Sequence, residues 1–137
     1  QITLEDYLMD RDEQFPEAEC LMPNGEDLVR RINNLLSLMV QDGVRLEVNP
    51  ATQSLVSSGW RPAYINQCTP GAAPKSKHIS MQACDIYDPH GEVDEWCLSN
   101  QEALKDCGLW LEHPAATKGW CHLQSLPPRS GRRVFYP

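Results

Sequence analysis

His78 and Asp85 lie seven residues apart in the segment that runs from Ser76 to Asp85. Zinc binds imidazole nitrogen at ~2.0–2.1 Å and carboxylate oxygen at similar distances. Residues 69–77 are rich in Pro, Gly, Ala and Lys and predict a loop, whereas 83–87 predict a strand that stops at an Asp-Pro pair. A loop histidine and a strand aspartate can converge on one ion if the turn between them folds back. The ordinary alternative is a surface histidine and an aspartate that caps a turn.

His122 is a third candidate ligand, in the middle of the alternating segment 120–124. The two-residue period of a strand puts Trp120, His122 and Gln124 on one face and Cys121 and Leu123 on the other. A histidine in such a place is often a packed core residue. With His78 and Asp85, however, it completes three protein ligands beside an open position, which is the arrangement of catalytic zinc sites.

The elements expected to position these residues describe one α+β domain over 1–137, with a small, mostly antiparallel sheet and flanking helices. Thr3 is expected to cap a short helix, Asn24 to begin one long helix that stops at Gly43, and a capping box from Ser99 to open a later helix. The expected strands cover 44–48, 55–60, 83–87, 109–112 and 119–124, and the tail is expected to fold back as an edge segment.

Composition narrows the class of function. The net charge is −7 and the only basic cluster, Arg129, Arg132 and Arg133, reads as a solvated tail, which argues against a nucleic-acid partner. No apolar run reaches the ~20 residues that span a membrane, so we expect no membrane insertion. No secretory signal is visible. The six cysteines form no CxxC pair, and we expect free, mostly buried thiols.

Three ordered elements resemble the zinc D-Ala-D-Ala carboxypeptidase family, peptidase M15, which includes phage endolysins that act as L-alanyl-D-glutamate endopeptidases. The first is Ser-x-His-x-x-Gly-x-Ala-x-Asp, matched by Ser76, His78, Ala83 and Asp85. The second is Ser58-Gly59-Trp60-Arg61-Pro62, and the third is Trp120-Cys121-His122. The resemblance covers about 55–124. It implies a Hedgehog/DD-peptidase-like fold and Zn²⁺ held by His78, Asp85 and His122.

The sequence departs from the family pattern at two places. The family glycine falls on Met81, so we expect a different backbone conformation in the turn after His78. The family's general base, a Glu or His two or three residues before the last ligand, is replaced by Gly119 and Trp120. Glu112, at the end of the preceding strand, is the first candidate for the base. The neighbouring His113 is the second, and a site without any base is the third.

The resemblance also implies roles for two side chains beside the metal. Arg61 would hold the substrate or the developing oxyanion, since a guanidinium stabilises the negative charge that grows in the transition state. Ser76 would contact the substrate or support the ligands.

The implied activity is hydrolysis of a peptide bond in bacterial peptidoglycan stem peptides, as a D,D-carboxypeptidase or an L,D-endopeptidase. We expect a monomeric phage or prophage lysis enzyme that waits in the host cytoplasm and acts at the cell wall after release. One alternative is a virion or structural domain that binds zinc without catalysis. The other is an interaction domain without metal, in which the His-Asp-His set is coincidental.

Overall fold

The computed structural model describes residues 1–137, and its centre is a five-stranded sheet in the order β1-β2-β4-β3-β5. The strands are β1 (Val56–Ser58), β2 (Ala83–Asp88), β4 (Gly119–Gln124), β3 (Trp110–Glu112) and β5 (Val134–Phe135). All neighbouring pairs are antiparallel except β3 and β5, which are parallel. The α+β class and the mostly antiparallel sheet are therefore confirmed, and the tail does form an edge strand.

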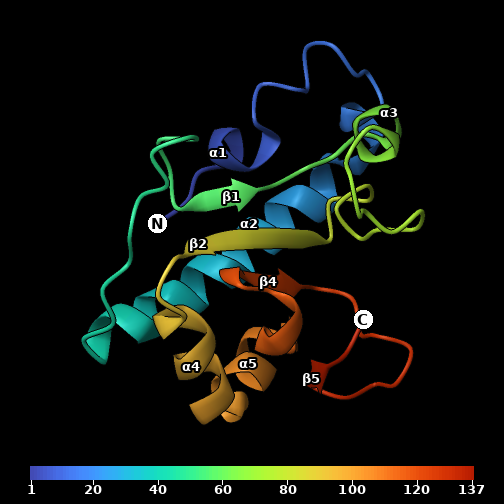
Figure 1. The fold of residues 1–137 in the computed structure, drawn as a ribbon. Helices are drawn as coiled ribbons and strands as arrows, with labels where there is room; N and C mark the ends of the chain where they lie inside the picture. Colours follow the sequence, from blue (N-terminus) through green and yellow to red (C-terminus); the bar gives the residue numbers. More distant parts are fainter.

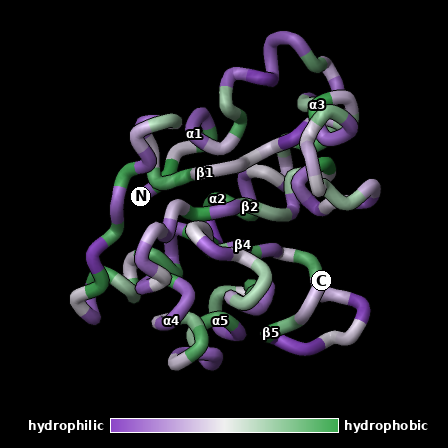
Figure 2. Tube along the Cα trace, viewed as in Figure 1, coloured by the Kyte–Doolittle hydropathy of each residue, from purple (hydrophilic) through white to green (hydrophobic).

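The long helix α2 (Ala18–Gln41) runs across one face of the sheet, as Figure 1 shows. Its apolar stripe, from Leu28 to Met39, is buried against the strands, and Figure 2 shows apolar stretches where the two meet. On the strands, Cys84, Ile86, Cys121 and Leu123 belong to this core. The predicted alternation is confirmed for both strands, so their other faces are free to carry Asp85 and His122.

The predicted start of the long helix is wrong. Asn24 does not cap the helix, which begins six residues earlier and includes Pro23. Instead, the Asn24 side-chain amide donates to the Ser80 carbonyl at 3.1 Å, outside the helix. Gly25 is buried where α2 meets the turn after His78, and a Cβ at Gly25 would lie 2.8 Å from the sulfur of Met81. The helix continues N-terminally because this first part packs against that turn.

The shorter helices differ more from the prediction. Helix α1 (Leu4–Leu8) begins after the predicted cap Thr3, which forms a capping box with Asp6, but α3 (Ala63–Gln67) and α4 (Glu92–Ser99) were not predicted. Helix α5 (Gln101–Cys107) ends at Gly108 as predicted, yet its N-cap is Asn100 and the expected Ser99 capping box is absent. Asp88, at the end of β2, stabilises the start of α4 because its carboxylate accepts the backbone N–H groups of Val93 and Asp94.

The predicted strand at 44–48 is also wrong, because no neighbouring strand pairs with it. Val44 and Leu46 pack against the core, which explains their alternation, while Val48 is 58% exposed. Alternating apolar residues are therefore not enough to form a β-strand when no neighbouring strand offers backbone hydrogen bonds. All six cysteines are free, as predicted, but only Cys84, Cys97 and Cys121 are buried.

Candidate metal centre

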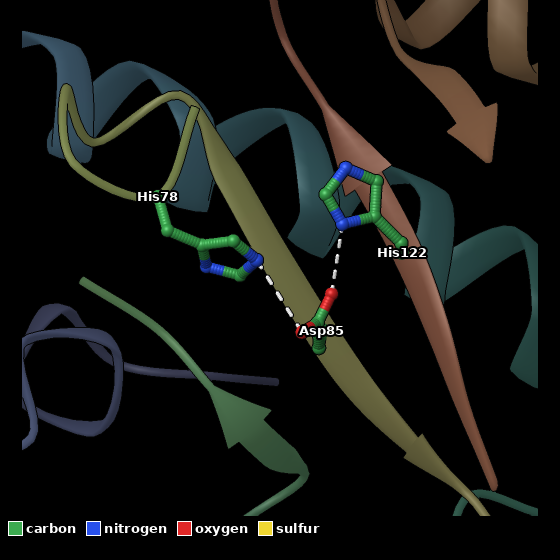
Figure 3. A group of neighbouring side chains, drawn as sticks. All are labelled: His78, Asp85 and His122. Atoms are coloured by element: carbon green, nitrogen blue, oxygen red, sulfur yellow. Dashed lines mark hydrogen bonds and ion pairs between the residues drawn. The ribbon is translucent and has the colours of Figure 1, made fainter. Parts of the chain in front are cut away.

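His78, Asp85 and His122 converge from three separate elements, and one ligand atom of each lies within 4.8 Å of the other two (Figure 3). His78 comes from the turn before β2, Asp85 from β2 and His122 from β4. The side chains are 2%, 14% and 12% exposed. The predicted ligand set is thus brought together in one place, and this group could hold a metal ion.

The pairing of β2 with β4 explains why Asp85 and His122 meet. The two residues are directly opposite in the antiparallel register. Side chains at such positions lie on the same face with Cβ atoms about 4.5–5.5 Å apart. Nδ1 of His122 lies 2.9 Å from Oδ1 of Asp85. A shift of one residue in this register would send one of the two side chains into the core.

The turn between residues 76 and 82 brings His78 to the same place. Its backbone closes through a hydrogen bond from the Gln82 N–H to the Lys77 carbonyl. Met81 has φ of +59° and is fully buried. Met81 thus adopts the left-handed backbone that glycine, the family residue at this position, favours. Such a conformation costs a residue other than glycine ~1–3 kcal/mol, and burial of the Met81 side chain offsets it.

The segment Ser58–Arg61 supports the His78 turn from the other side. Nδ1 of His78 lies 2.8 Å from the Gly59 carbonyl oxygen, and the Arg61 N–H donates to the His78 carbonyl. The indole N–H of Trp60 donates to the Ile79 carbonyl at 3.0 Å. Because a carbonyl only accepts, Nδ1 of His78 carries a hydrogen, and Nε2 is the ring nitrogen that faces Asp85.

Helix α1 in turn holds both segments. The buried Tyr7 hydroxyl donates to the Ala83 carbonyl of β2 at 2.8 Å. The Tyr7 carbonyl accepts the Trp60 N–H, and a Cβ on Gly59 would lie only 2.0 Å from that carbonyl oxygen. Gly59 is therefore required for close backbone contact. Sequence reasoning assigned no role to Tyr7, and the only signal for Gly59 was its place in the Ser-Gly-Trp-Arg element.

The protonation of Asp85 and His122 reflects their contact. Burial alone would raise the pKa of Asp85, but the charge of His78 and the hydrogen bond with His122 outweigh it and hold that pKa well below its usual range. Burial alone would lower the pKa of His122, but Asp85 and the side chain of Gln124 raise it. Nδ1 of His122 faces Oδ1 of Asp85 and Nε2 faces Oε1 of Gln124, and two such acceptors favour the protonated ring.

The donor set fits a divalent cation. Nε2 of His78 lies 3.3 Å from Oδ2 of Asp85, and Nδ1 of His122 lies 2.9 Å from Oδ1 of the same carboxylate, so two ring nitrogens and a carboxylate meet at one place. Two imidazoles and one carboxylate also leave a coordination position free, which a substrate or water needs.

The ligands line a cleft of about 460 Å³ that also contains Arg61, Ser76, Glu112 and Trp120. Loop residues 70–73 form part of its wall. Nη2 of Arg61 lies 3.3 Å from the Ser76 hydroxyl, while its buried Nε has no acceptor. The Ser76 hydroxyl also accepts the His78 N–H at 3.2 Å. Arg61 and Ser76 are therefore beside the ligands, as predicted, and the Nε–H of Arg61 has no acceptor within the protein.

Glu112 lies in the cleft, and His113 does not line it. Leu109 and Leu111 are buried in the core, and Glu112 falls on the opposite face of the strand. Burial raises the pKa of the Glu112 carboxyl, and the negative charge of Asp85 adds to this, whereas His122 acts in the opposite direction. His113 accepts the Ala115 N–H through Nδ1 and stacks on Tyr136 with ring centroids 4.4 Å apart. Of the two predicted bases, only Glu112 faces the ligands.

Comparison with known proteins adds no family to this description: no protein-family model, curated protein or solved structure matches the chain. No helix is both long enough and apolar enough to cross a membrane.

Proposed function

We propose that this protein is a zinc-dependent peptidase that hydrolyses a peptide bond in the stem peptides of bacterial peptidoglycan. The observation that supports it best is the convergence of His78, Asp85 and His122 in a cleft that also holds Arg61 and Glu112. A metal-binding triad alone fits many functions. Hydrolysis of an amide also needs a positive group that stabilises the developing negative charge and a base that takes a proton. Arg61 and Glu112 lie beside the triad and have the chemistry for these two tasks.

The resemblance to the zinc D-Ala-D-Ala carboxypeptidase family supplies the substrate class. The sequence elements that carry it are the ones that build the cleft: the Ser58–Pro62 segment, the turn from Ser76 to Asp85, and β4. We therefore propose a Hedgehog/DD-peptidase-like fold and either carboxypeptidase or endopeptidase activity. A monomeric phage or prophage lysis enzyme, held in the host cytoplasm until it is released to the wall, is the context we propose.

The proposed mechanism assigns one task to each side chain. Zinc, when bound, acts as a Lewis acid that polarises the peptide carbonyl and makes water more acidic. Glu112 takes the proton of the attacking water and passes it to the leaving amine. Its raised pKa makes it a stronger base than an exposed glutamate. Arg61 donates to the oxygen that becomes negative in the tetrahedral intermediate. Its buried Nε–H, which has no acceptor within the protein, supports this role.

The competing proposal is a zinc-binding virion or structural domain without catalysis. In the sequence, Gly119 and Trp120 stand where the family has its general base before His122, and this favours a domain without catalysis. The position of Glu112 in the cleft supports the catalytic proposal instead, since a carboxylate faces the ligands from the neighbouring strand.

Metal analysis combined with digestion of purified peptidoglycan tests the proposal. We expect about one zinc per chain, and mass spectrometry should detect shortened or separated stem peptides that disappear after chelation and return with zinc. Stoichiometric zinc without any product would favour the non-catalytic domain. A protein that contains no zinc and whose melting temperature does not change with chelator would contradict both zinc-binding proposals. The grouping of His78, Asp85 and His122 would then be coincidental.

A further inference from the structure

Gln124 is buried, with 4% exposure, on the same face of β4 as His122 and two residues after it. Its side-chain Oε1 lies 3.0 Å from Nε2 of His122. Its Nε2 donates to the Leu126 carbonyl at 2.7 Å. The amide therefore lies between one ring nitrogen of a metal ligand and a backbone carbonyl.

The Leu126 carbonyl determines which way this amide points. A carbonyl oxygen only accepts, so the NH₂ group of Gln124 must face Leu126 and the amide oxygen must face His122. An amide oxygen also only accepts, and Nε2 of His122 must then carry a hydrogen. The neutral imidazole with its hydrogen on Nε2 has its lone pair on Nδ1, the nitrogen that faces Asp85.

We infer that Gln124 is a positioning residue that fixes His122 in the tautomer and ring orientation needed to bind the metal through Nδ1. The Leu126 carbonyl orients Gln124, and Gln124 orients His122. The backbone carbonyl of Gly59 orients His78 in the same way. Its oxygen lies 2.8 Å from Nδ1 of His78, which leaves Nε2 as the metal ligand. Metal-bound histidines in general donate their second N–H to such an acceptor, and loss of that acceptor typically costs 10–100-fold in metal affinity.

The inference rests on the metal site of the proposed function but not on hydrolysis. A protein that binds zinc and cleaves nothing would end the proposed function and leave the role of Gln124 intact. Unchanged zinc binding after loss of the Gln124 amide would end this inference and leave the proposed function intact.

The test compares two substitutions at this position in the full chain. Gln124→Leu keeps similar volume and removes the acceptor, and we expect its zinc dissociation constant, measured by competition with a chromophoric chelator, to rise about 10–100-fold. Gln124→Glu keeps an acceptor for Nε2–H but loses the donor to the Leu126 carbonyl, so we expect its loss of zinc affinity to be clearly smaller than that of Gln124→Leu. Asn33→Leu is the control, because it removes two hydrogen bonds to Ile2 and belongs to no part of the cleft.

A spectroscopic readout separates positioning from general loss of structure. In the zinc-loaded parent protein, ¹⁵N NMR of the His122 ring should show Nδ1 bound to zinc and a hydrogen on Nε2 protected from exchange. In zinc-loaded Gln124→Leu that hydrogen should exchange faster. If Gln124→Leu does not fold, the parent spectrum and Gln124→Glu still decide. Coordination through Nε2 in the parent, or equal zinc affinity in Gln124→Leu, would overturn the inference.

Discussion

At the scale of single residues, the three ligands are not equivalent in what they require of the chain. Asp85 and His122 need only the correct strand register, because opposite positions of an antiparallel pair share a face. His78 needs a closed turn, a glycine carbonyl and a residue with positive φ. Of the three ligands, His78 thus has the most specific surroundings.

Loss of either histidine should abolish the metal site. We expect His78→Ala and His122→Ala to lose the stoichiometric zinc of the parent, since two remaining ligands bind zinc far more weakly than three. The measurement is zinc content after dialysis against a weak chelator. His90→Ala, at an exposed histidine in the turn after β2, is the matched control and should keep its zinc. Full occupancy in both ligand variants would exclude the site.

Glu112 should be required for turnover and not for metal binding. Glu112→Gln keeps the shape of the side chain and removes its basicity, so we expect the rate of stem-peptide hydrolysis to fall about 10²–10⁴-fold with zinc still bound. His113→Ala should stay near the parent rate because His113 does not line the cleft. Both variants should be compared at equal zinc content. Near-normal hydrolysis by Glu112→Gln would remove it as the base.

At the scale of elements, the strands that carry Asp85 and His122 were predictable, and the short helices α3 and α4 were not. Alternation in 83–87 and 119–124 reports a buried face directly, so it predicted which side chains point to the cleft. The segment 44–48 shows the same alternation because Val44 and Leu46 pack against the core, but no strand pairs with it. Alternation in a sequence does not report whether a partner strand is present. Asn24 was expected to begin the long helix, yet packing of the first part of α2 on the Met81 turn extends the helix toward its N-terminus.

Roles that depend on contacts distant in sequence escaped prediction for the same reason. Tyr7 and Ala83 are 76 positions apart. The apposition of His122 and Asp85 could be anticipated because each strand shows its own two-residue period. A hydroxyl that supports a strand from another element leaves no such pattern.

The contact between α1 and the Ser58–Arg61 segment should govern the metal site. In Gly59→Ala the new methyl group would meet the Tyr7 carbonyl, so the backbones must separate, which typically costs ~1–3 kcal/mol. Because the Gly59 carbonyl also holds His78, we expect weaker zinc binding as well. Urea unfolding and chelator competition measure the two effects.

Tyr7→Phe provides the contrast. It leaves the buried Ala83 carbonyl without its donor and should cost ~1–3 kcal/mol of unfolding free energy. It leaves the Gly59 carbonyl in place, so zinc affinity should change little. If both variants lost stability equally and neither lost zinc affinity, the support of His78 by Gly59 would be wrong.

At the scale of the whole molecule, the site couples stability to pH in opposite directions with and without metal. The pKa of Asp85 is lowered from its ordinary 3.8, so its contribution is present above that value and is lost in acid. The pKa of His122 is raised from its ordinary 6.5, so its contribution is present below that value and is lost as pH rises through the raised pKa. This pair therefore stabilises the metal-free protein most between these two ordinary values.

Zinc should reverse the trend, because it must displace the His122 proton. We expect the zinc-induced rise in melting temperature to be small near pH 5 and to grow toward pH 8. At free zinc 100-fold above the dissociation constant the gain is about 2.7 kcal/mol, or on the order of 10 °C for a chain of this size. Scanning fluorimetry with and without chelator measures it. A shift independent of pH would mean that zinc binds without displacing that proton.

The position of Asp85 and His122 on facing strands also determines when in folding the site can exist. The two residues are 37 positions apart, and they meet only after β2 and β4 have paired in register. A chain in which that pair is still open offers zinc no preformed site. Zinc should therefore slow unfolding markedly while leaving the refolding rate almost unchanged, provided that the pair closes after the rate-limiting barrier. Stopped-flow traces with and without metal would then place the closure of the central strand pair along the folding reaction, with the ion serving as its reporter.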